Sequence, residues 1–476
     1  ITGLAAARDL VRAGVDVVLV EAGDRLGGKI ATNKVGGFVV ELGPDSMLTT
    51  RPAAVTLARE LGLGDELIGV SEPRSVHILR DRKPVPMPEG VGLVLPSRAL
   101  PFVTTRLFSW PEKLRMGVDL VMPRQLGAED TSVGGFLRRR LGSALVSRLA
   151  GPLVGGIYGT SIDELSLDAV VPTLRDAERD HRSLIVAGLS DGRRIRARIK
   201  AAPPAQGRPL GVFASLRGGL GHLVAALESE LSPARVERGV SVERLSRAGT
   251  TYRAHLSDGR ELRVDGVIVT SPGPATARLL ADVAPRASAA VAAIAHGSTT
   301  VVNLAYRLEQ FASPPVGHGW LIPANEGLPL SALTWSSNKW AGRAPADSML
   351  IRAFLPDQPS GGRTVDDLVT LARSSVERLA GVRGEPALVR AAAYAGTMPR
   401  YTVGHLTRVA TAESEVAGQP TLALAGALYH GVGLPDCISS GISAARKLID
   451  ALGETGDFAA DLHSVAVPTP VLGSAT

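Results

Sequence analysis

The chain has 476 residues, of which 45% are hydrophobic and 4% aromatic, and its formal net charge is +6. That length allows two or three domains with buried cores. The single cysteine, Cys437, excludes a disulfide framework and a multi-thiolate metal cluster, and it is typical of a reducing compartment. A basic surface suits polyanionic ligands, acidic membranes and nucleic acids alike. Since so few aromatic residues argue against a surface that stacks bases, we expect no nucleic-acid partner.

No uninterrupted apolar run reaches about 18 residues, so we expect no transmembrane helix. No export signal is visible, and we expect a cytoplasmic protein. The arginine excess that gives the chain its positive charge is also typical of a high-GC genome, so the charge alone does not indicate a polyanionic partner.

The chain opens with a helical pattern that continues to Ala13 and is closed by Gly14. A strand pattern follows from Val15 to Val20 and ends in Glu21. An acidic residue roughly 20 positions after a glycine-rich turn is the ribose-binding signature of a dinucleotide fold. Gly3 would be the third glycine of that fingerprint, and we expect the first strand and the other two glycines to precede residue 1. A helix and strand without a ligand are the alternative.

The other end of the chain repeats the order strand, glycine-rich turn, helix. An apolar run at 422–427 precedes the turn around Gly431 and Gly433, and an amphipathic helix pattern covers 438–452. Such a turn presents backbone N–H groups and the positive end of a helix, and its glycines allow a flat or anionic ligand to approach closely. A plain turn before a helix is the alternative.

Between these ends the pattern predicts several further elements. We expect helices at 51–63, 131–149, 222–231 and 364–379, a broken helical stretch at 96–123 and a hairpin at 75–86. We expect strands at 240–245, 252–256, 264–270, 299–306, 320–322, 330–335 and 349–354. Alternating apolar and polar positions in the later strands favour an antiparallel sheet with one covered face.

Three segments have a distinctive composition. Residues 193–200 carry five cations in eight positions, which suits anionic headgroups or a solvated loop. Residues 201–209 contain three prolines and are typical of a linker. Residues 453–476 are rich in small residues and proline, and we expect a disordered tail.

The sequence holds no H-E-x-x-H, no cysteine–histidine cluster and no G-x-S-x-G motif, so hydrolase and metal chemistry lack support. We predict no metal ligand and identify no catalytic side chain. His405 and His430 are candidate bases, but a lone histidine beside a motif is more often structural.

Several segments resemble known families. Arg25-Leu26-Gly27-Gly28-Lys29 and the segment 41–46 resemble the flavin-dependent amine oxidase superfamily. The turn and helix start at 431–441 resemble the porphyrinogen oxidase family, as do the segments 155–166, 172–183 and 398–405. These blocks occur in the family's order between residues 1 and about 452.

The resemblance implies an α/β fold with a Rossmann-like FAD-binding domain, as in amine oxidases and p-cresol methylhydroxylase, a mixed-sheet substrate domain and a helical insertion. It implies FAD-binding segments 1–73, 207–284 and 405–452, substrate-binding segments 74–94 and 285–404, and a helical domain, 95–206, that touches the membrane surface. The implied FAD contacts are Thr2, Gly3, Glu21, Ala22, Arg25, Gly28, Lys29, Gly43, Pro44, Asp45, Ser46, Val242, Tyr394, Gly426, Val432, Gly433 and Leu434.

The resemblance also implies an activity: six-electron oxidation of a porphyrinogen in haem synthesis, with O2 as acceptor and hydrogen peroxide released. Plant and animal members carry an arginine for a protoporphyrinogen propionate where this chain has Val91. Gram-positive members are generally coproporphyrinogen III oxidases, so we expect coproporphyrinogen III as substrate and protoporphyrinogen IX as the alternative. An amine oxidase, a carotenoid desaturase and a flavin-free carrier stay open. A ferrochelatase partner and peripheral contact with the inner face of the plasma membrane are further expectations.

Overall fold

The computed structural model describes residues 1–72, 75–91, 94–125, 127–201, 210–356 and 363–454. The expected disordered tail therefore lies almost entirely outside the described residues, and so does the expected linker. Among the described residues, no helix is long and apolar enough to cross a membrane.

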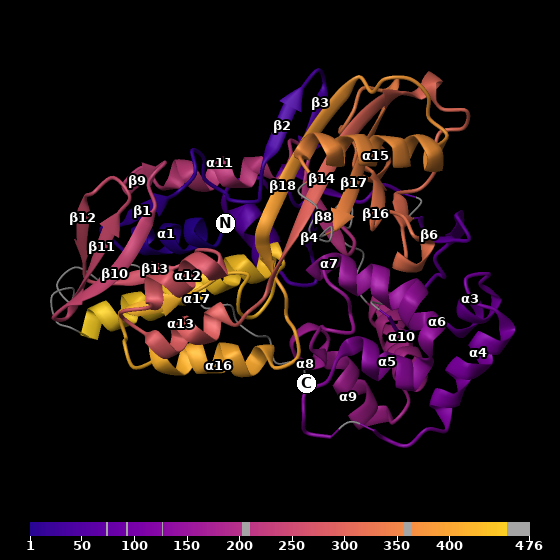
Figure 1. The fold of residues 1–476 in the computed structure, drawn as a ribbon, viewed down its shortest axis with the longest axis horizontal. Helices are drawn as coiled ribbons and strands as arrows, with labels where there is room; N and C mark the ends of the chain where they lie inside the picture. The colour runs from indigo at the N-terminus through magenta and orange to yellow at the C-terminus, as the bar shows by residue number, and fades with distance from the viewer. Residues whose placement is uncertain (73–74, 92–93, 126, 202–209, 357–362, 455–476) are drawn as a thin grey trace.

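The described residues form three structural units. The first unit contains two pairs of parallel strands. β1 (Val18–Glu21) pairs with β9 (Arg235–Arg238), and β13 (Val267–Val269) pairs with β19 (Leu422–Leu424). Helices α1 (Thr2–Arg12) and α17 (Leu434–Glu454) pack against each other beside these strands (Figure 1). A Cβ at Gly441 of α17 would overlap the carbonyl oxygen of Thr2, so only glycine allows this close approach.

Further elements complete this unit. A three-stranded antiparallel sheet contains β10 (Val242–Ala248), β11 (Thr251–Leu256) and β12 (Glu261–Val264). It shares a buried core with α12 (Gly273–Leu280), α13 (Pro285–Ala292) and α16 (His405–Val416). The remaining elements are α2 (Ala53–Glu60), η1 (Gly64–Glu66), α11 (Gly221–Glu230), β2 (Thr32–Val35), β3 (Phe38–Glu41) and a small sheet of β4 (Met47–Leu48), β8 (Phe213–Leu216) and β5 (Leu67–Gly69).

A seven-stranded sheet in the order β18-β14-β17-β16-β15-β6-β7 forms the second unit. Its strands are β18 (Leu388–Pro399), β14 (His296–Arg307), β17 (Ser348–Pro356), β16 (Ala332–Trp335), β15 (Gly319–Leu321), β6 (Val76–Arg80) and β7 (Lys83–Pro86). Its short helices are η4 (Leu308–Gln310), η5 (Ala324–Glu326) and α14 (Ser336–Lys339). The sheet is mixed, because β15 and β6 pair in parallel while the other neighbours are antiparallel.

The prediction of one covered face is wrong for the centre of this sheet. Helix α15 (Val365–Ala380) covers one face of β14 and β17, while Phe38 and Val40 of β3 pack with Ala305 and Leu350 of these strands. The central residues of β14 are therefore buried on both sides.

The third unit is helical and occupies the lower right of Figure 1. It contains α3 (Ala99–Thr104), α4 (Trp110–Gly117), η2 (Val118–Leu120), α5 (Val133–Leu141), α6 (Ser143–Leu145), the π-helical η3 (Val146–Gly155), α7 (Gly156–Tyr158), α8 (Leu167–Val170), α9 (Pro172–His181) and α10 (Leu184–Ala201). The cationic run at 193–200 lies in α10, so its interpretation as a loop is wrong.

The α1–α17 contact leads to a stability prediction. We expect Gly441→Ala to lower the free energy of unfolding by about 1–3 kcal/mol, because the overlap with the Thr2 backbone outweighs alanine's better helix propensity. Gly453→Ala in the same helix meets nothing within 4 Å, so its stability should range from that of wild type to about 1 kcal/mol above it, because only the helix propensity changes. Urea unfolding followed by circular dichroism measures both, and equal stability of the two variants would contradict the close-packing argument.

Candidate flavin site

The carboxyl ends of the parallel strands meet the start of α1. Thr270 follows β13, and a Cβ at Gly3 would lie 3.0 Å from its Oγ1. Gly426 follows β19, and a Cβ there would lie 3.7 Å from Thr2 Oγ1. No described side chain caps the N-terminus of α1. In open α/β sheets, ligands bind outside the carboxyl ends of the strands, and free helix N–H groups suit a diphosphate.

Glu21 ends β1, as the sequence predicted, and its surroundings suit a ribose. One carboxylate oxygen accepts a hydrogen bond from Gly23 N–H at 2.8 Å, and the backbone N–H of Val240 lies 3.3 Å from the Glu21 carbonyl oxygen. Val242 begins β10, two residues after Val240. Ala22 is exposed beside them.

The loop after β1 is held by its own arginine. The Arg25 guanidinium donates to the carbonyl oxygens of Leu26, Gly28 and Ile30, so this side chain shapes the loop. Gly28 has a φ of +59° and open space where a Cβ would stand, which leaves room for a ligand against the main chain. Lys29 donates through Nζ to the Thr397 carbonyl oxygen at 2.7 Å, and burial lowers the pKa of this lysine.

Gly43 lies against this loop. A Cβ at Gly43 would overlap the Lys29 carbonyl oxygen, so the position requires glycine. The Tyr394 hydroxyl donates to the same oxygen at 3.3 Å. Three predicted contacts that are up to 365 residues apart in sequence, Lys29, Gly43 and Tyr394, therefore lie together.

Asp45 is buried in a cluster of cations. Its carboxylate accepts hydrogen bonds from Lys339 Nζ and Trp340 Nε1, each at 3.0 Å, and Arg352 Nη1 lies 3.2 Å away. Burial alone would raise the pKa of Asp45, but Lys339 and Arg352 hold it well below its usual range. Pro44 and Ser46 flank Asp45, and the Ser46 hydroxyl donates to its carboxylate at 2.9 Å. The Asp45 carboxylate is therefore occupied by partners inside the protein.

The C-terminal turn lies at the N-terminus of α17. The Asp436 side chain folds back over the turn, where a Cβ at Gly431 would lie 2.6 Å from its Cγ, and it forms an ion pair with Arg51. Val432 packs against the core of the helical unit. The backbone around Gly433 and Leu434 therefore lies where the first and third units meet.

These residues fit a dinucleotide with a flat ring. The uncapped α1 terminus suits the diphosphate, and the Glu21 carboxylate can accept a hydrogen bond from a ribose hydroxyl. Gly28, which has open space where a Cβ would stand, leaves room for a ligand against the main chain. Sequence reasoning missed Thr270 and the Ser440 hydroxyl, which accepts from Gly426 N–H at 3.0 Å. Thr270 could have been predicted as a site residue, because it is a polar residue at the end of the apolar strand at 264–270.

The two candidate histidines have different environments. His405 is fully buried, and its Nε2 lies 2.9 Å from the Tyr429 carbonyl oxygen, so Nε2 carries the proton. Burial is the main cause that lowers the pKa of His405 to about 4. His430 is exposed and lies 2.7 Å from Glu413. These contacts favour the structural interpretation of both.

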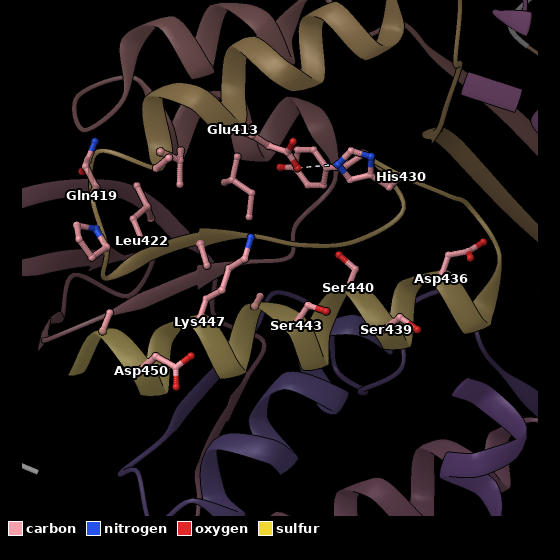
Figure 2. Close-up of a pocket in the computed structure, with 18 residues that line it drawn as sticks. Glu413, Gln419, Leu422, His430, Asp436, Ser439, Ser440, Ser443, Lys447 and Asp450 are labelled. Carbon is pink, nitrogen blue, oxygen red and sulfur yellow. Dashed lines mark hydrogen bonds and ion pairs between the residues drawn. The ribbon is translucent and has the colours of Figure 1, made fainter. Parts of the chain in front are cut away.

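The His430–Glu413 pair borders a groove of about 790 Å³ between α16, β19 and α17 (Figure 2). Ser440 and Lys447 point into it from α17. The sequence analysis did not predict this groove.

His405 predicts a pH dependence of stability. Its folded pKa, about 4, lies below its ordinary value of 6.5, so neutral His405 stabilises the fold above pH 6.5, and this contribution is lost as the pH falls toward 4. The loss is roughly 3 kcal/mol. The hydrogen bond to the Tyr429 carbonyl and the charge of Asp130 oppose this lowering of the His405 pKa, whereas the charges of Arg408 and His430 add to it.

His405→Gln keeps an amide donor for the Tyr429 carbonyl but does not titrate. The free energy of unfolding, measured in urea between pH 7.5 and 4.5, should therefore depend less steeply on pH for this variant than for wild type. The control His181→Gln changes a histidine that is not among the groups acting on His405, so it should keep the wild-type dependence. An identical pH dependence of the free energy of unfolding in His405→Gln and wild type would show that His405 is not the group responsible.

Comparisons with known proteins agree with this geometry. Residues 1–449 match the family model described as flavin containing amine oxidoreductase. The chain is 47% identical to a coproporphyrinogen III oxidase of Propionibacterium freudenreichii subsp. freudenreichii, over 95% of this chain and 89% of that protein. It is 32% identical to the protoporphyrinogen oxidase of Bos taurus, over 94% and 96%. A crystal structure from Exiguobacterium sp. 255-15 is 31% identical and has a TM-score of 0.81, covering 94% of this chain and 96% of that one. The chain belongs to the flavin-containing amine oxidoreductase family.

Proposed function

We propose that the protein is a coproporphyrinogen III oxidase that uses FAD and oxygen. It removes six electrons and six hydrogens from coproporphyrinogen III to give coproporphyrin III, and three O2 are reduced to three hydrogen peroxide. The observation that carries the proposal is the 47% identity, over 95% of the chain, to a relative of that name. Two groups of contacts support it: Thr2 and Gly3 lie beside Gly426 and Thr270 at the strand ends, and Gly43 and Tyr394 lie against Lys29.

FAD, when bound, supplies the acceptor for the hydride and passes the electrons to O2. The chain binds and orients it. Thr2 and Gly3 would face the diphosphate, Glu21 the ribose, and the backbone at 432–434 the ring. Packing of Val432 against the helical core excludes water from this end of the site.

We also propose that the three structural units have separate tasks. Segments 1–73, 207–284 and 405–452 bind FAD, 74–94 and 285–404 bind the substrate, and 95–206 covers it. At the boundary near 285, α13 packs with the core of the first unit. The buried contacts of Asp45 with Lys339 and Arg352 support this division, because they fix the sheet of the second unit against the flavin loop.

Val91 supports the choice of substrate. This half-buried residue packs against the helical core and forms an isolated bridge with Pro96, so its apolar side chain offers no cation for a propionate at this position. Coproporphyrinogen III has four propionates, and arginines elsewhere would hold them.

The substrate assay tests this proposal. Anaerobically prepared coproporphyrinogen III and protoporphyrinogen IX are each added to the protein with FAD, and porphyrin fluorescence is followed after air is admitted. We expect a severalfold preference for coproporphyrinogen III, with peroxide released and with rates above those of enzyme-free controls. A preference for protoporphyrinogen IX would transfer the assignment to that substrate, and no acceleration of either by the yellow protein would refute porphyrinogen oxidation.

We further propose that the helical unit touches an anionic membrane surface and that a ferrochelatase consumes the porphyrin product. Exposed apolar side chains gather on α3, α4 and η2, among them Leu100, Trp110, Leu114 and Val121, each at least 65% exposed. Lys113 lies 4.8 Å from the Trp110 ring centre and adds positive charge. Aromatic and aliphatic groups beside a cation suit the boundary between headgroups and acyl chains.

We expect the double variant Trp110→Ser, Leu114→Ser to sediment with anionic phosphatidylglycerol vesicles severalfold less than wild type, because it loses apolar area that would be buried in lipid. The matched control is Val316→Ser, Val365→Ser, which changes two exposed valines of the second unit and should sediment like wild type. Equal sedimentation of both double variants would contradict membrane contact through this surface.

A further inference from the structure

One tyrosine hydroxyl holds both ends of the segment that leads into the flavin turn. Tyr401 is 1% exposed, and its hydroxyl donates to the Ala427 carbonyl oxygen at 2.7 Å. The same oxygen accepts from the Gly431 N–H at 2.8 Å. Both backbone groups are therefore satisfied by one side chain, and the distance between them is fixed by its position.

His405 supports this tyrosine from the other side. The two rings are stacked at a centre-to-centre distance of 3.8 Å and an angle of 15°. His405 Nε2–H donates to the carbonyl oxygen of Tyr429, which lies in the middle of the same segment. Tyr401 and His405 thus bind three main-chain groups within residues 427–431.

The helical unit holds this pair in place. The backbone N–H of Ser166 donates to the Tyr401 carbonyl oxygen at 2.7 Å, and the N–H of Val403 donates to the Glu164 carbonyl oxygen at 3.0 Å. Asp130 accepts from the Gly404 N–H at 2.9 Å. Gly404 has a φ of +81°, which favours glycine between the two rings. The chain of contacts runs from the helical unit through Tyr401 to Gly431.

We propose that Tyr401 is a positioning residue for the flavin, with His405 as its support. The tyrosine sets the place of the turn at Gly431–Leu434 against the flavin ring and so determines FAD affinity and the reduction potential of the bound flavin. This inference rests on the proposed FAD site. It assigns a positioning role to the segment 398–405, which resembles the porphyrinogen oxidase family and has no role in the proposed function above.

A role in core packing alone makes a different prediction. Tyr401→Phe keeps the ring and its stacking on His405 but removes both hydrogen bonds to the segment. If Tyr401 only filled the core, the variant would lose some stability without altering the flavin. If it positions the turn, the properties of the bound flavin change in folded protein.

The experiment compares the full chain with Tyr401→Phe and Tyr252→Phe. Tyr252 is the matched control, because its buried hydroxyl, in the first unit, donates to Gln419 at 3.2 Å, away from the flavin turn. FAD is removed and added back, its dissociation constant is measured by flavin fluorescence, and the midpoint potential and visible spectrum of the bound flavin are recorded. Circular dichroism confirms that each protein is folded.

We expect Tyr401→Phe to bind FAD about tenfold more weakly, with a changed midpoint potential and spectrum, while Tyr252→Phe matches wild type. Wild-type affinity, potential and spectrum in Tyr401→Phe would overturn the inference. Failure of the wild-type chain to take up FAD would instead refute the proposed FAD site itself.

If Tyr401→Phe does not fold, His405→Phe replaces it. That variant keeps a stacked ring but loses the donor to Tyr429, so we expect the same changes at smaller size. Unchanged flavin properties in folded His405→Phe would overturn the inference equally.

Discussion

The buried charge of Asp45 is the constraint that orders the rest of the site. An isolated carboxylate in this position would cost several kcal/mol, so its cations must come with it. The cations, Lys339 and Arg352, come from the second unit, and the neutral Trp340 indole donates a further hydrogen bond to the same carboxylate. Arg352 also donates to the Gly43 carbonyl oxygen, and Arg343 lies 3.6 Å from Glu41. A buried ion pair is weak evidence for net stability, but here it fixes one relative position of two units.

Close backbone contacts connect the Asp45 cluster to the proposed flavin site. Gly43 lies against the Lys29 carbonyl oxygen, so displacement of the Asp45 cluster would move the loop that the sequence assigned to FAD. On the opposite side, Tyr401 and His405 connect the helical unit to the C-terminal turn. The proposed cofactor site is therefore held by groups from all three units. This explains why its sequence blocks are spread over more than 400 residues.

The sequence predicted those parts of the fold that depend on local pattern. The hairpin at 75–86 was correct, because two short apolar runs flank a charged turn, and Asp81 and Arg82 adopt the positive φ that such a turn needs. Glu21 was correctly placed at the end of its strand. Strand β18 was not predicted, because its centre, Ala391 to Ala393, has little β propensity and owes its place to pairing with β14. The Asp45 cluster joins residues 294 apart, and no local pattern indicates such contacts.

The arrangement also explains why no catalytic base could be identified from the sequence. His405 is neutral and spends its one donor on Tyr429. Besides the acidic Glu21 and Asp436, the described residues bring positive charge to the site. It comes from the N-terminal ends of α1 and α17, the half-buried Lys29, and an Asp45 cluster in which Lys339, Arg343 and Arg352 outnumber Glu41 and Asp45. A group that accepts electrons gains negative charge, and fixed cations and dipoles stabilise it without reorganising. The chemistry thus depends on where the chain holds the flavin, which is why its most constrained residues bind backbone rather than substrate.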